Sequence, residues 1–136
     1  MNRLTRALLA VPAAVVLVAT ATTTVASASS PSGPPPPEGF GVWCVSVTGA
    51  KACFAEYGDR MWVKDTKANG EPAGATIKSK LPGAYWYREC FNRLGADGGW
   101  AYCDFDVPEN AAGELWVVNN PFIGAQAKVN IYTTVI

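Results

Sequence analysis

Aromatic and acidic side chains alternate along two stretches of the sequence, residues 85–90 and 100–107, and their types suit ligand binding. At every second position one side of these stretches collects aromatic rings and carboxylates: Tyr85, Tyr87, Glu89, Trp100, Tyr102, Asp104 and Asp106. Such a surface can stack on sugar rings while its carboxylates accept hydrogen bonds from hydroxyls, or it can receive a basic protein partner. The alternative is structural, because tyrosine and tryptophan are favoured on strands and can line a solvated face that binds nothing.

Catalysis is poorly supported by the composition. The 136 residues contain no histidine, which excludes Ser-His-Asp and Cys-His relays and histidine-ligated zinc. Glu89, Asp104 and Asp106 could supply a carboxylate pair for glycoside hydrolysis, but a domain this small has little room for a cleft. The acids between residues 94 and 127 also lack the spacing of a calcium loop. We therefore expect no enzyme, no metal ion and no cofactor.

The charge balance excludes another class of partner. The chain carries 11 basic and 11 acidic residues, a formal net charge of zero, whereas a nucleic-acid binder normally has a basic excess to neutralise phosphates. Eight of the basic residues lie between residues 51 and 93, and none lies between 94 and 127. We expect no nucleic-acid partner.

The first 39 residues have the pattern of an export signal followed by a spacer. Two arginines precede a short apolar run, and Ala26-Ser27-Ala28 supplies the small residues that a signal peptidase requires. The apolar run is shorter than the roughly 20 residues that span a bilayer as a helix. The sequence thus predicts a signal peptide over 1–28, a proline-rich extended linker over 29–39 and one domain over 40–136, secreted and without a membrane segment.

The cysteines predict two disulfides, since an exported domain with a small core gains stability from them. Residues 43–47 and 51–57 have the character of strands joined by a tight turn, and a two-residue loop there places Cys44 directly opposite Cys53 on a non-hydrogen-bonded rung. The remaining pair, Cys90 and Cys103, would then close a second hairpin around the glycine-rich turn at 95–99. In that hairpin Glu89 would lie opposite Asp104, and Arg88 would share the core face with the cysteines.

Apolar residues recur with period two, the signature of half-buried strands. The predicted strands are 43–47, 51–57, 60–64, 75–78, 85–90, 100–107, 114–118 and 126–136, with turn residues between them. Seven or eight short strands in about 100 residues favour an all-β fold, a small antiparallel sandwich or a small barrel.

The polar, glycine-rich segment 65–74 provides an alternative functional site. It reads first as an exposed turn. An exposed loop on a disulfide-stiffened β scaffold is also the usual form of a protease-inhibitor reactive site.

One resemblance supports export and the two bridges. The run GDRMWVKDTKANG at 58–70, together with Ala52-Cys53-Phe54, Cys90 and Trp100-Ala101-Tyr102-Cys103, resembles a group of small secreted actinobacterial proteins of uncharacterised function. The subtilisin inhibitors and the neocarzinostatin-like apoproteins are similar in size, export and disulfide number, but their motifs have no counterpart here. We therefore expect a secreted, monomeric, non-enzymatic module that binds an extracellular glycan or protein.

Overall fold

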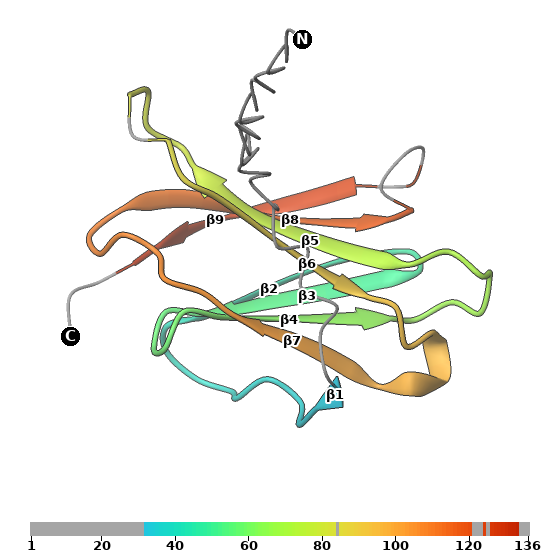
Figure 1. The fold of residues 1–136 in the computed structure, drawn as a ribbon. Helices are drawn as coiled ribbons and strands as arrows, with labels where there is room; N and C mark the ends of the chain where they lie inside the picture. Colours follow the sequence, from blue (N-terminus) through green and yellow to red (C-terminus); the bar gives the residue numbers. More distant parts are fainter. Residues whose placement is uncertain (1–31, 84, 121–123, 125, 134–136) are drawn as a thin grey trace, which may run out of the picture.

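In the computed structural model the chain forms two antiparallel sheets packed face to face, which confirms the predicted all-β sandwich (Figure 1). The structure describes residues 32–83, 85–120, 124 and 126–133, so the expected signal peptide lies outside the described residues. Sheet 1 has the strand order β1-β7-β4-β3-β2, and sheet 2 has the order β6-β5-β8-β9. The elements are β1 Ser32–Gly33, β2 Val42–Val47, β3 Ala50–Ala55, β4 Arg60–Asp65, β5 Ala73–Ser79, β6 Tyr87–Asn92, the 3-10 turn η1 Ala96–Gly98, β7 Trp100–Asp104, β8 Ala112–Asn119 and β9 Gln126–Tyr132.

The core lies between the sheets and is built from alternate positions of their strands. In β8, for example, buried and half-buried residues alternate along the whole strand. The largest fully buried apolar side chains come from both sheets: Phe54, Met61, Val63, Ile77, Leu115 and Val117. Burial of each contributes about 1.5–3 kcal/mol relative to exposure. The same alternation directs the intervening side chains to the two outer faces, where any ligand must bind.

The β2–β3 hairpin has the predicted register. Cys44 pairs with Cys53 and Val47 with Ala50, and the cysteines form a disulfide across Cα atoms only 4.1 Å apart. Gly49 in the turn has φ +95°, a conformation that glycine adopts without steric cost. The short loop therefore sets this register locally.

The predicted second hairpin is wrong, although its disulfide is present. Cys90 and Cys103 are bonded, with Cα atoms 5.9 Å apart, but β6 pairs with β5 in sheet 2 while β7 pairs with β4 and β1 in sheet 1. The bridge therefore joins the two sheets, and Figure 1 shows β6 and β7 in different layers. Glu89 pairs with Thr76 and Asp104 with Arg60, so the two acids are not opposite each other.

The inward side chains of β6 all reach across to sheet 1 or to the loop that follows it. Arg88 donates to the carbonyl of Asp106, at 2.8 Å, which explains an arginine on the core side. Two positions further on lies the disulfide, and beyond it the buried Asn92 donates to the carbonyls of Val63 and Gly99, at 2.9 and 2.8 Å. This edge of the sandwich is thus closed by a covalent bond and polar contacts. The two disulfides also indicate an oxidising environment, since such bonds persist there and are rare in reducing compartments.

The expected linker is in contact with the domain from Ser32 onward. Ser32 and Gly33 form β1 and pair with β7, at the edge of sheet 1 opposite β2. The segment between β1 and β2 runs along the outer side of sheet 1 (Figure 1). That side carries a small apolar cluster in which Trp62 is only 5% exposed.

Candidate functional site

The structure divides the seven predicted binding residues between opposite faces of the sandwich. Tyr87 and Glu89 lie on the outer side of β6 in sheet 2, and the fully exposed Tyr85 comes just before that strand. Three of the others, Trp100, Tyr102 and Asp104, lie on the outer side of β7 in sheet 1. Asp106 lies in the loop that follows β7. The single aromatic and acidic face that a β6–β7 hairpin would have created is therefore absent, because those strands belong to different sheets.

One groove gathers the aromatic residues that flank β6 on sheet 2. This tyrosine groove has a volume of about 470 Å³ and its lining includes Lys78, Lys80, Tyr85, Trp86, Tyr87 and Glu114. Tyr85 is 100% exposed and Tyr87 49%. The volume lies within the range of small-molecule binding sites, roughly 300–1,000 Å³. Two of the predicted binding residues thus meet here.

Trp86 contributes a largely buried ring to this lining. Its side chain is 93% buried, being 7% exposed, and its indole N–H has no hydrogen-bond partner among the described residues. The ring lies over Gly113 of β8, where an added Cβ would come within 2.6 Å of the indole carbon Cη2. The N–H itself is buried, so Trp86 contributes apolar ring surface to the groove and no hydrogen bond to a ligand.

Tyr87 and Glu89 interact with each other beside the groove. The Tyr87 phenol donates a hydrogen bond to the Glu89 carboxylate. Partial burial, followed by this contact, raises the pKa of the Tyr87 phenol above its ordinary value. The phenol therefore stays protonated at neutral pH and orients the carboxylate.

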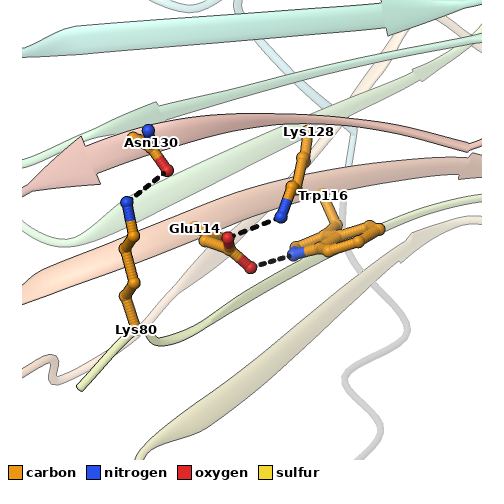
Figure 2. A network of polar contacts seen from close by, with 5 residues as sticks. All are labelled: Lys80, Glu114, Trp116, Lys128 and Asn130. Carbon is orange, nitrogen blue, oxygen red and sulfur yellow. Dashed lines mark hydrogen bonds and ion pairs between the residues drawn. The ribbon is translucent and has the colours of Figure 1, made fainter.

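A polar network continues from the groove across sheet 2 (Figure 2). Glu114 accepts a hydrogen bond from the Trp116 indole N–H at 3.0 Å and forms an ion pair with Lys128 at 2.7 Å. The hydrogen bond from Lys128 is the main reason that the pKa of Glu114 lies below its ordinary value. The Trp116 ring has the ammonium of Lys78 at 4.5 Å and that of Lys128 at 4.9 Å from its centroid. The two ammoniums cover the Trp116 ring through cation–π contacts. Tyr85 and Tyr87 are therefore the neighbouring aromatic rings that remain open to a ligand.

On sheet 1 the predicted residues have protein partners. Asp104 forms an exposed ion pair with Arg60, at 2.6 Å. Tyr102 packs against the Trp62 cluster and leaves no room for a side chain at Gly33. Trp100 lies beneath Lys51 and Lys64, whose ammoniums are 5.9 and 5.8 Å from its ring centroid.

The loop between β4 and β5 was the alternative site. It is exposed over residues 66–71 and is folded by side-chain turns, in which Asp65 accepts from the Lys67 amide and Asn69 from the Glu71 amide. Beside it lies a wide groove of about 1,020 Å³. Two successive turns do not present the extended segment that a protease would bind as substrate, so the geometry favours the tyrosine groove.

The comparisons leave the function to be argued from this geometry. No family model, curated protein or solved structure matches the chain. Within the described ranges, no three cysteine or acidic side chains gather closely enough to ligate a metal ion. No helix in the part of the chain that the structure describes is long and apolar enough to cross a membrane.

The sequence reasoning missed half of the tyrosine groove and the network beside it. Lys78, Glu114, Trp116 and Lys128 come from β5, β8 and β9, which are neighbours in sheet 2. Alternation in 112–119 could have placed Glu114 and Trp116 on the same outer face. It could not have shown which strands flank them.

Proposed function

We propose that the protein is a secreted, monomeric, non-enzymatic module that binds an extracellular glycan in the tyrosine groove. The observation that carries this proposal is the fully exposed ring of Tyr85 beside Tyr87 in one groove whose lining also includes the polar side chains of Lys78, Lys80 and Glu114. A sugar ring has an apolar face that stacks on aromatic side chains and hydroxyls that need polar partners. The groove offers both.

The polar side chains of the groove suit hydroxyl recognition. The carboxylate of Glu114 accepts hydrogen bonds, and the ammonium of Lys80, which donates to Asn130 at 3.2 Å, has further donors. These groups offer hydrogen-bond partners beside the aromatic rings, as a binding site for a polar ligand requires.

The test is binding of the purified protein, with both disulfides formed, to a panel of insoluble polysaccharides and cell-wall preparations. We expect saturable binding that Tyr85→Ala weakens roughly tenfold, the loss typical of a central aromatic contact. Tyr132→Ala is the matched control, because Tyr132 is 48% exposed on the same sheet but outside the groove.

The outcomes separate the competing functions. Equal losses in Tyr85→Ala and Tyr132→Ala would mean that the groove is not the site. Binding to no polysaccharide would exclude the glycan and favour a protein partner. Inhibition of an extracellular protease, unaffected by Tyr85→Ala and lost after cleavage within 66–71, would establish the loop as the working site instead.

A further inference from the structure

Each outer face carries a tryptophan flanked by two lysines. On sheet 2 the closed cluster consists of Trp116, Lys78, Lys128 and Glu114, and its carboxylate bonds both the indole N–H and one ammonium. On sheet 1 the open cluster consists of Trp100, Lys51 and Lys64, both ammoniums lying within 6 Å of the ring centroid at 5.9 and 5.8 Å. The open cluster has no counterpart of Glu114.

The two lysines of the open cluster are direct cross-strand neighbours. Lys51 of β3 pairs with Lys64 of β4, which in turn pairs with Trp100 of β7. Like charges directly opposite each other on a sheet repel and destabilise it. Both side chains are half-buried, which reduces the screening of that repulsion by solvent.

No acid on these three strands is available to neutralise the pair. Asp104 is engaged with Arg60, four register positions away from the Lys64–Trp100 pair on the same two strands. Asp65 is 97% buried, being 3% exposed, and accepts a hydrogen bond from the Lys67 amide. Neither lysine has a carboxylate within ion-pair distance in the part of the chain that the structure describes.

We propose that the open cluster is a binding site for an oxyanion, a phosphate or carboxylate group of an extracellular ligand. The closed cluster shows what fits between a tryptophan and two lysines, because there the chain itself supplies a carboxylate. In the open cluster the ligand supplies it, held by the ammoniums of Lys51 and Lys64 beside the Trp100 ring. Lysine binds either kind of oxyanion as a point charge. This site is on the sheet opposite the tyrosine groove and does not depend on it.

The test is a titration of the full folded protein with inorganic phosphate against chloride at equal ionic strength, followed by amide chemical shifts. We expect saturable shifts centred on β3, β4 and β7. Lys51→Gln and Lys64→Gln should each weaken binding roughly tenfold, the loss expected for one charge-assisted hydrogen bond. Lys128→Gln is the matched control, because its ammonium flanks a tryptophan whose cluster already contains a carboxylate and it lies outside the lining of the tyrosine groove.

A second arm distinguishes the sources of the oxyanion. Soluble polygalacturonate carries carboxylates and pullulan is its neutral counterpart. Binding of polygalacturonate that needs Lys64 indicates an anionic glycan, whereas a response to phosphate alone indicates a phosphorylated ligand. Both outcomes support the site.

Two results would overturn the proposal. One is the absence of saturable binding to both phosphate and polygalacturonate by the unmodified protein. The other is an equal loss of binding in Lys128→Gln and Lys64→Gln, which would mean that the anion responds only to the net charge of the protein. Loss of neutral-glycan binding in Tyr85→Ala bears only on the tyrosine groove, so the two sites fail or succeed separately.

Discussion

The closed cluster on sheet 2 and the open cluster on sheet 1 are built from the same side-chain types and differ in one carboxylate. Around Trp116 the two ammoniums lie 4.5 and 4.9 Å from the ring centroid, and Glu114 ties the indole N–H to Lys128. Around Trp100 the ammoniums lie further from the ring centroid, at 5.8 and 5.9 Å, and the two lysines are paired across neighbouring strands. In the closed cluster a carboxylate of the chain balances the charge of the lysines. In the open cluster no carboxylate among the described residues does so, and the surface there can therefore receive an anion.

Removing the carboxylate should break the closed cluster. Glu114→Gln keeps the shape of the side chain but loses its charge, and we expect the free energy of unfolding to fall by about 1–2 kcal/mol, the scale of a charge-assisted hydrogen bond. Urea denaturation measures this. Glu109→Gln, at an exposed loop position, should change stability by less than about 0.5 kcal/mol. The same Glu114 variant should also gain affinity for phosphate on sheet 2; a stable variant without that gain would show that the two clusters are not equivalent.

Adding a carboxylate should close the open cluster. Lys51→Glu replaces a repulsive cross-strand pair with an attractive one opposite Lys64, so we expect a gain of about 0.5 kcal/mol at low ionic strength. The gain should vanish in 1 M salt, where screening acts within about 3 Å. Lys67→Glu, in the exposed loop, is the control and should have no such effect. Thermal unfolding at the two salt concentrations decides, and destabilisation by Lys51→Glu would contradict the description of this cluster.

The smallest expected effect is on the pH dependence of stability, which the lowered pKa of Glu114 changes in the closed cluster only. The pKa of Glu114 lies below its ordinary 4.5 because of the hydrogen bond from Lys128. A depressed carboxyl pKa contributes stability above the unfolded pKa that is lost as the pH falls through the folded pKa. The stability difference between the unmodified protein and Glu114→Gln should therefore be constant above about pH 4.5 and shrink below it. An NMR titration in which Glu114 behaves as an ordinary glutamate would refute this cause.

Part of the candidate site could be predicted from the sequence. Tyr85, Tyr87 and Glu89 were predicted to share one side of a strand, and the structure places them together along β6 and at its start. Their expected partners Trp100 and Tyr102 lie on the other sheet. Alternation determines which face of its own strand a side chain occupies. It does not determine which strand lies next to it.

The two disulfides show the same division. Cys44–Cys53 closes a hairpin with a two-residue loop, so the register of β2 and β3 follows from the sequence alone. Cys103 lies thirteen positions after Cys90, a spacing that is compatible with a hairpin and also with a connection from one sheet to the other. Both cysteines face the core, at 0% and 4% exposure, and in a sandwich the core is where the sheets meet.

Most strands of the domain, their inward and outward faces and the one hairpin with a local turn follow from the sequence, because they depend on neighbours within a few residues, whereas β1 forms in the segment expected to be linker. The tertiary structure alone decided that β6 and β7 lie in different sheets and that β5, β8 and β9 are neighbours. Those pairings join residues far apart in the chain, and what selects them is the joint burial of two apolar sheet faces. The strand pairing places Glu114 between Lys128 and Trp116. It also places Lys51 opposite Lys64, where no carboxylate from the described part of the chain lies between them.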